Sequence, residues 1–307
     1  MSDAGPQENA YLSEAGLAIS PDGTKIAANQ SSDRKLLGLS GTSGTTIWDT
    51  TDGTILERFD NGRTGALAWH PGGDLLAIGG TSTVSVVEPT GDERWLLQGA
   101  ADEAMVIGLA FHPEGTQLAS LGSDGSLRLW SLGDGGCSPL HELRIDGGRG
   151  GVDYSPDGEV LAASGPGGVS LWDTSDGKGI QGVPDVEGHP YGLAYDMEGD
   201  LIIGTGEPAA IHIISADGDV LDGPAPRSLR PLHIAPASGR IVAVGGEHDN
   251  QVLIWDRNDE SRKDLPRVRG SVGVLRWSPD GATLYGVSRS QGVIAWSGSD
   301  WEPFDLP

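Results

Sequence analysis

The chain has 307 residues, with 20 Lys and Arg against 44 Asp and Glu, so its formal net charge at pH 7 is −24. This charge argues against binding to nucleic acid or to an anionic membrane through the overall electrostatic field. The single cysteine, Cys137, excludes an internal disulfide framework and a multi-cysteine zinc site. No apolar run is long enough to span a bilayer and the first residues lack the features of a secretory signal, so the sequence predicts a cytoplasmic protein.

Seven related segments recur along the chain, each made of an apolar run, a turn and a second apolar run. They begin at Leu17, Leu67, Leu109, Val152, Leu193, Leu232 and Leu275. The turn positions, at intervals of 39 to 50 residues, are Pro21, Pro71, Pro113, Pro156, Met197, Pro236 and Pro279. Pro presets φ in such a turn, and the Asp-Gly that often follows accepts the remaining turn geometry. A period of this length indicates a repeat architecture.

Each copy carries a second marker downstream, a Trp-Asp pair or a relative of it. These markers begin at Ile47, Val86, Leu129, Leu171, His212, Ile254 and Ala295. Short alternating apolar runs between the turns predict four strands per copy, named a to d in chain order. One such sheet cannot bury both of its faces, whereas seven sheets arranged radially bury them against each other.

The pattern is similar to the seven-bladed β-propellers of the WD-repeat family over residues 16–307. Trp48-Asp49, Trp172-Asp173 and Trp255-Asp256 keep the full Trp-Asp pair, and Gly188-His189 keeps the family's Gly-His dipeptide. The resemblance implies an all-β fold of seven four-stranded antiparallel blades, with blades starting near residues 16, 66, 108, 151, 192, 231 and 274. No copy has the family's complete His–Ser–Asp–Trp network, so we expect the stability of the fold to depend more on strand packing than on that hydrogen-bond network.

Two segments are candidates for the outer strand that closes the ring. The C-terminal candidate, Trp301 to Pro307, contains Pro303 and ends with the chain, and proline is disfavoured within a sheet. We therefore favour residues 1–15, with the run NAYLSE, as the closing strand.

Chemistry-bearing residues do not form a recognisable catalytic or metal motif. His70 and His112 occupy equivalent repeat positions, which favours structural roles over metal binding. Asp217, Asp219 and Asp222 lie in one loop that lacks the spacing of a calcium hand, so a solvated turn is the better interpretation. We predict no cofactor, no bound metal and no enzymatic activity. The alternative is a propeller enzyme of the lactonase or lyase kind with a site at the central channel, which rests on fold analogy.

In the family geometry the b–c and d–a connections lie on one face, here called the top face, and the a–b and c–d connections on the other. The top face is predicted to be near charge balance, so the excess of acid falls on the opposite face and the rim. Arg63 and Arg149 stand where the family has His after Gly. They either pair with the neighbouring Asp60 and Asp146, the slightly favoured interpretation, or capture a carboxylate or phosphate of a partner.

The first copy has an insertion between strands b and c, roughly SSDRKLLGLSGTSG, which contains Arg34, Lys35, Leu36 and Leu37. Loop insertions on rigid scaffolds often carry recognition, and they are equally often tolerated drift. Both interpretations stay open.

These observations predict a non-catalytic scaffold, of bacterial origin, that binds a partner protein with an acidic or phosphorylated segment through its top face. We expect it to be a monomer or a subunit of a hetero-complex; a salt-adapted structural subunit is a further alternative. The candidate partner-binding residues are Arg34, Lys35, Leu36, Leu37, Arg63, Arg149, His189, Arg230, Arg269 and Arg289.

Overall fold

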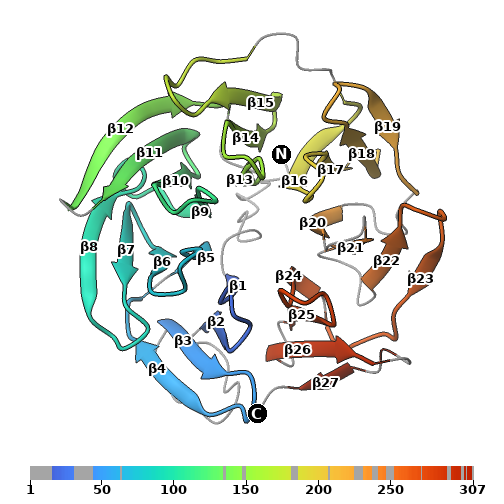
Figure 1. Ribbon diagram of the computed structural model, residues 1–307, viewed down its shortest axis with the longest axis horizontal. Helices are drawn as coiled ribbons and strands as arrows, with labels where there is room; N and C mark the ends of the chain where they lie inside the picture. Colours follow the sequence, from blue (N-terminus) through green and yellow to red (C-terminus); the bar gives the residue numbers. More distant parts are fainter. Residues whose placement is uncertain are drawn as a thin grey trace, which may run out of the picture.

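The computed structural model describes residues 16–30, 44–62, 64–133, 136–146, 150–180, 186–206, 208–224, 231–236, 241–246, 252–270, 272–288, 292–298, 301 and 303–305. Every regular element in these residues is a β-strand, and the strands form seven antiparallel sheets around a central axis (Figure 1). No helix in the described residues is long and apolar enough to cross a membrane.

The sheets use the strands in consecutive order, and we number the sheets 1 to 7 along the chain. Sheets 1 to 3 contain β1 (Leu17–Ile19), β2 (Lys25–Gln30), β3 (Gly44–Asp49), β4 (Ile55–Phe59), β5 (Leu67–Trp69), β6 (Leu76–Gly79), β7 (Thr83–Val87), β8 (Glu93–Gln98), β9 (Val106–Phe111), β10 (Gln117–Gly122), β11 (Ser126–Gly133) and β12 (Gly136–Arg144). Sheets 4 and 5 contain β13 (Val152–Tyr154), β14 (Val160–Gly165), β15 (Gly168–Asp173), β16 (His189–Tyr195), β17 (Leu201–Gly206), β18 (Ala210–Ile214) and β19 (Val220–Asp222). Sheets 6 and 7 contain β20 (Pro231–Pro236), β21 (Ile241–Gly246), β22 (Val252–Asp256), β23 (Arg262–Asp264), β24 (Val272–Trp277), β25 (Thr283–Ser288), β26 (Gly292–Ser297) and β27 (Pro303–Asp305).

In the described residues six of the seven sheets are four-stranded blades, so the expectation of seven such blades is wrong by one. Sheet 4 has three strands, β13 to β15. A fourth strand only begins there: Gly179 forms a bridge with Trp172, and the Ile180 N–H donates to the Leu171 carbonyl at 2.8 Å. Residues 181–185, which follow directly, lie outside the described residues.

The outer strand of sheet 7 comes from the C-terminal segment, which corrects our preference for the N-terminal one. Strand β27 pairs with β26 in the register Trp296–Pro303, Ala295–Phe304 and Ile294–Asp305. Pro303 is the first residue of an outermost strand, a position where the missing N–H is tolerated. Residues 1–15 lie outside the described residues.

The apolar core lies between the sheets rather than at the centre of the ring. Seven clusters of buried residues occur in the described part of the chain, one at each junction between neighbouring sheets. At the junction of sheets 7 and 1, for example, Leu17, Ile26 and Trp48 pack against Tyr285 and Val287. Burial of both faces of each sheet supplies the main driving force for the ring.

The a–b turns explain why Ser and His recur before the turn proline. Ser20 Oγ donates to Asp22 Oδ1 at 2.5 Å and accepts the Lys25 N–H at 2.9 Å, which closes the turn. His70 and His112 occupy the Ser20 position in sheets 2 and 3, where each Nδ1 accepts a backbone N–H of its own turn at 3.1 Å. These two histidines are thus turn residues of separate sheets.

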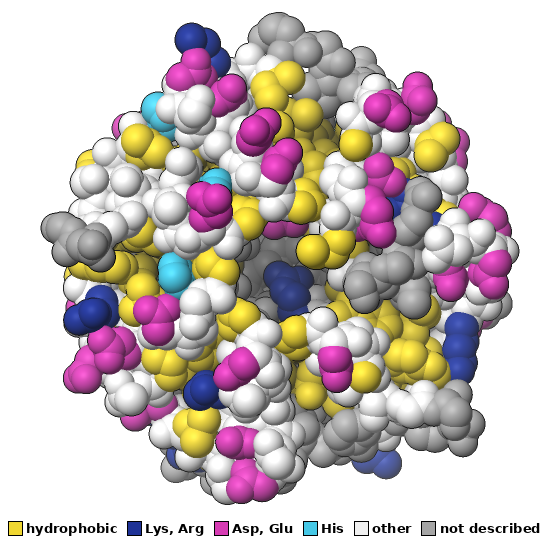
Figure 2. Space-filling view, in the orientation of Figure 1, with side chains coloured by type: hydrophobic (Ala, Val, Ile, Leu, Met, Phe, Trp, Pro, Cys, Tyr) yellow, Lys and Arg dark blue, Asp and Glu magenta, His cyan; other side chains and the backbone are white. Residues whose placement is uncertain are grey.

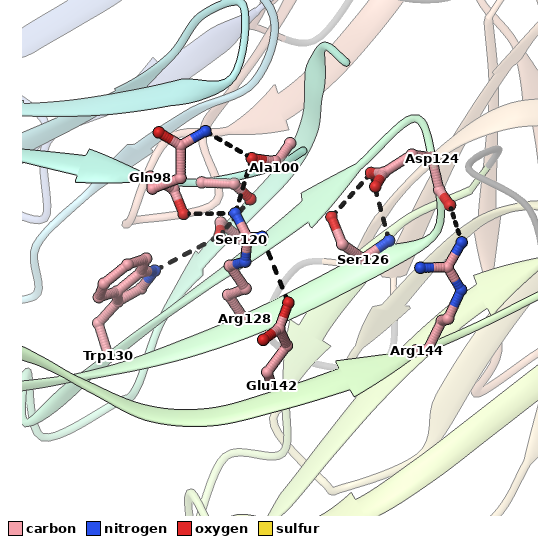
Figure 3. A network of polar contacts seen from close by, with 10 residues as sticks. Gln98, Ala100, Ser120, Asp124, Ser126, Arg128, Trp130, Glu142 and Arg144 are labelled. Carbon is pink, nitrogen blue, oxygen red and sulfur yellow. Dashed lines mark hydrogen bonds and ion pairs between the residues drawn. The ribbon is translucent and has the colours of Figure 1, made fainter. Parts of the chain in front are cut away.

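Part of the family's buried network is present between sheets 2 and 3 (Figure 3). Trp130 Nε1–H donates to Ser120 Oγ at 3.5 Å, and Ser120 Oγ donates to the Gly99 carbonyl at 3.0 Å. The Gly99 carbonyl therefore takes the place of the family's histidine. Asp124 stays in its own turn, where it accepts from Ser126 Oγ at 2.7 Å.

Other tryptophans lack that partner, as the incomplete motifs predict. The indole N–H groups of Trp48, Trp255 and Trp296 are buried without a hydrogen-bond partner. Trp48 pairs in register with Ile26, so Ala28 stands where sheet 3 has Ser120 and offers no hydroxyl group. Packing rather than this network therefore holds these sheets.

A buried ion cluster joins sheets 5 and 6. Arg257, in the c–d turn of sheet 6, donates to Asp196 and Asp200, which flank the a–b turn of sheet 5. The Arg257 side chain is 3 % exposed and that of Asp196 is 0 % exposed. Asp196 Oδ1 also accepts the N–H groups of Glu198 and Asp200, so Asp196 takes over the turn-closing role of Ser20.

Candidate functional site

The inner strands β1, β5, β9, β13, β16, β20 and β24 surround a central channel. Their C-terminal ends and the turns that follow line a cavity of about 530 Å³. In Figure 2 the face toward the viewer is hollowed at its centre, with Lys or Arg atoms inside the hollow and acidic side chains over the surrounding sheets.

The penultimate residue of every inner strand lines this cavity. Side chains alternate along a strand, so the residues on either side pack between sheets while this one faces the channel. The seven residues at this position are Ala18, Ala68, Ala110, Asp153, Ala194, Ala235 and Arg276. Five alanines leave space, and the two exceptions carry opposite charges.

Arg276 extends into the channel from β24. Its Nη1 donates to the Leu275 carbonyl at 2.9 Å, and no carboxylate in the described part of the chain lies within ion-pair distance of it. The side chain is exposed to the channel. The surrounding strands displace part of its hydration, which lowers the pKa of Arg276, and the charge of Asp153 opposes this shift.

Asp153 is half-buried on β13, and its carboxylate is held by two backbone groups. Oδ1 accepts the Tyr154 N–H at 3.0 Å, and Oδ2 accepts the Tyr195 N–H of the neighbouring sheet at 2.9 Å. Burial raises the pKa of Asp153 to about 6, against the opposing effects of these hydrogen bonds and of Arg276. The charges of Asp153 and Arg276 therefore influence each other's pKa across the channel, although the two side chains do not form a contact ion pair.

Aromatic and sulfur side chains complete the wall. Trp69 Nε1–H donates to the Ala18 carbonyl at 3.2 Å, and Trp277 Nε1–H donates to the Ala235 carbonyl at 2.8 Å, so that both rings are fixed against the preceding sheet. Met197 replaces the usual turn proline and is 72 % exposed at the cavity. The site thus combines Asp153 and Arg276 with apolar side chains and with Asp196, whose carboxylate is already paired with Arg257.

The raised pKa of Asp153 predicts a pH-dependent gain from Asp153→Asn. The folded state binds this proton more tightly than the unfolded state, whose value is near 3.8, so the contribution of Asp153 to stability falls as pH rises from about 4 to 6. The variant should gain about 1–2 kcal/mol in unfolding free energy relative to wild type over this window, a range reduced from the full shift for channel solvent. Denaturant titrations at several pH values measure the gain.

Asp157→Asn is the matched control for this experiment. Hydrogen bonds from Ser155 Oγ and from the Glu159 N–H lower the pKa of Asp157, so removal of its carboxylate should give a pH dependence of the opposite sign. An Asp153→Asn curve parallel to wild type between pH 4 and 6 would contradict the enclosed-carboxylate interpretation.

Two of the predicted partner-binding residues belong to the described part of the chain. His189 is exposed at the start of β16, where it pairs in register with Gly206. Arg269 is exposed in the β23–β24 connection, and its carbonyl accepts from Ser288 Oγ at 2.6 Å. The others, Arg34, Lys35, Leu36, Leu37, Arg63, Arg149, Arg230 and Arg289, lie outside the described residues.

Asp217 and Asp219 lie in the c–d turn between β18 and β19, whereas Asp222 ends β19 and its carboxylate is already engaged. Asp222 Oδ1 lies 2.8 Å from His212 Nδ1, and His212 Nε2 lies 3.1 Å from the Glu187 carbonyl. Among the described residues, no group of three or more His, Cys, Asp or Glu side chains is arranged to hold a metal ion.

Sequence reasoning missed Asp153 and Arg276, although the repeats contain the signal. Aligned on their turns, four copies carry alanine at the second position of this run, the sixth carries His233, and only Asp153 and Arg276 place a formal charge there. In the structure Ala235 takes this position in β20. The sequence alone shows that these two copies carry a charge where most other copies carry alanine. It does not show that both charges face one channel.

The sequence comparison covers the outer strand of sheet 2 and three strands of sheet 3, whereas the fold comparison covers nearly the whole chain. The family model "WD domain, G-beta repeat" matches residues 91–131. No curated protein matches the chain in sequence. Among solved structures 1808 chains match, and one from "Crystal Structure of Mitotic Checkpoint Complex" has a TM-score of 0.77 at 16% identity, covering 98% of this chain and 96% of that chain. The chain is therefore similar to WD-repeat proteins in the sequence of residues 91–131 and is a β-propeller in fold.

Proposed function

We propose that this chain is a non-catalytic scaffold that binds a partner protein through its top face, in the bacterial cytoplasm. The observation that carries the proposal is the WD-domain match at residues 91–131, because resemblance to this family implies protein interaction. The fold likeness to a chain from a mitotic checkpoint complex is in keeping with a role in assembly.

The proposed partner presents an acidic or phosphorylated segment. Arg267 and Arg269 are exposed in the β23–β24 connection, which belongs to the d–a class and so to the top face. Arg63 and Arg149 lie outside the described residues, and in the sequence they stand between β4 and β5 and between β12 and β13. Guanidinium groups bind carboxylate and phosphate through paired N–H donors, and several on one face would select such a segment in a protein that otherwise repels acid.

Charge reversal on the top face tests the proposal. We expect Arg267→Glu with Arg269→Glu to release a stoichiometric partner that the wild-type chain captures from its source cells, and we expect moderate salt to do the same. Capture is quantified by mass spectrometry of the eluted proteins, and thermal melting checks that the variant is folded.

Arg94→Glu with Lys178→Glu is the matched control, since it changes the net charge equally at the start of outer strand β8 and in the c–d turn of sheet 4, away from the top face. It should retain the partner. Retention by the top-face variant, or equal loss in both variants, would reject the top face as the binding surface.

A further inference from the structure

The two channel charges stand where the repeat itself requires only alanine. Five of the seven sheets fill this position with Ala, so the fold closes without a charge there. Half-buried Asp153 is held by two backbone N–H groups, and Arg276 is exposed to the channel. The two charged side chains line one cavity without contact between them, so both remain available to a molecule inside it.

Both groups have binding capacity left. A guanidinium has five N–H donors, and the structure gives Arg276 one hydrogen bond, to the Leu275 carbonyl. A carboxylate accepts about four hydrogen bonds, and Asp153 accepts two, from the N–H groups of Tyr154 and Tyr195. These two bonds fix the orientation of the carboxylate, so its remaining lone pairs are preorganised.

We propose that the channel cavity binds a small zwitterion, whose carboxylate pairs with Arg276 and whose ammonium group pairs with Asp153. The cavity of about 530 Å³ lies within the range of small-molecule sites. The alanine methyl groups, with Trp69 and Trp277, form an apolar wall for the carbon chain between the two charged ends.

The net charge of the protein selects against other ligands with one of these groups. With a formal charge of −24, the chain repels a free anion that Arg276 alone would attract. A free cation would meet Arg276 inside the cavity. A molecule without net charge that carries both signs avoids both penalties, which is why the proposal names a zwitterion.

A series of ω-amino acids tests the site and measures its span. The probes are glycine, β-alanine, 4-aminobutyrate and 6-aminohexanoate, titrated at millimolar concentration against the full chain and followed by NMR. The amide signals of Tyr154 and Tyr195 report directly on Asp153, to which both donate. Butyrate and butylamine, each with one charged group, are the ligand controls.

We expect one chain length to bind best, with saturable shifts of both amide signals, and butyrate and butylamine to bind at least tenfold more weakly. Arg276→Ala and Asp153→Asn should each weaken binding of the best probe at least tenfold. Arg276→Ala installs the residue of five sibling strands, so we expect it to fold, and Arg267→Ala on the top face should leave binding unchanged.

The alternative is a water-bridged charge pair that stabilises the ring. In that case no probe binds saturably, and Arg276→Ala lowers the melting temperature more than Arg267→Ala does. This result overturns the proposal, as does binding that persists in both channel variants or that butyrate matches. Neither result bears on the top-face scaffold, because the two sites share no residue.

Discussion

Arg257→Met should lower the free energy of unfolding by about 3–5 kcal/mol, the range for removal of one partner from a buried ion pair. The side chain of Arg257 contacts the carboxylates of Asp196 and Asp200, whose side chains are 0 % and 11 % exposed. Without the guanidinium, two acidic groups of the β16–β17 turn stay buried beside each other. Urea unfolding followed by tryptophan fluorescence measures the loss.

Arg94→Met is the matched control, because Arg94 forms an exposed ion pair with Glu88 at 3.1 Å and its loss should change stability by at most about 1 kcal/mol. A triple variant gives the stricter test. Arg257→Thr, Asp196→Ser and Asp200→Thr together install the residues that other copies carry at these places, such as Thr50 and Ser20. It should recover most of the lost stability, since no buried charge remains. A triple variant as unstable as Arg257→Met would show that the charges themselves are not the cause.

Gly158→Ala should lower the free energy of unfolding by about 2–4 kcal/mol, from backbone strain together with displacement of a packed ring. Gly158 has φ of +76° in the a–b turn of sheet 4. A Cβ there would fall on the Nε2 edge of the His112 ring, which belongs to sheet 3. The His112 ring packs edge-on against the Tyr154 ring, with the ring centroids 5.4 Å apart, and its Nδ1 accepts the Glu114 N–H. It therefore has little freedom to move.

Gly23→Ala separates the two contributions. Gly23 has φ of +72° in the equivalent turn of sheet 1, but its nearest neighbour for a Cβ is Pro279 Cδ at 3.3 Å. It should therefore show backbone strain of about 1–2 kcal/mol without the ring term. The additional loss of stability in Gly158→Ala relative to Gly23→Ala should vanish when His112 is replaced by Ser, the residue found at the equivalent position Ser20. Equal losses at the two glycines would exclude the contact between sheets as a cause.

The strands could be predicted from the sequence because each copy contains the residues that form its own turns and end its own strands. In sheets 1, 2, 3, 4 and 7 a Ser or His at the Ser20 position closes the a–b turn by local hydrogen bonds, and Trp48-Asp49 and its relatives end strand c. Such signals need no information from other copies. The prediction was wrong at the ring closure, where the outer strand is β27, and the described residues of sheet 4 form three strands instead of the predicted four.

The buried ion cluster and the channel site could not be predicted from the sequence, for a related reason. Arg257 and Asp196 are 61 residues apart, and each looks like an unremarkable departure within its own copy. Only the angle between neighbouring sheets brings them together. Asp153 and Arg276 likewise become one site because their strands lie around one channel, which no single repeat specifies.

The consecutive use of strands has a consequence for the order in which the molecule forms. Every strand pairing in the described residues joins neighbours along the chain, so each sheet can form with short loop closures and low contact order. One junction is different: β1 packs against β24 although more than 250 residues separate them. In the described residues no shared strand links sheets 1 and 7, and side chains such as Leu17, Trp48 and Tyr285 alone hold them together. This topology predicts that folding proceeds as growth of an open arc of sheets, with the contact between sheets 1 and 7 formed last.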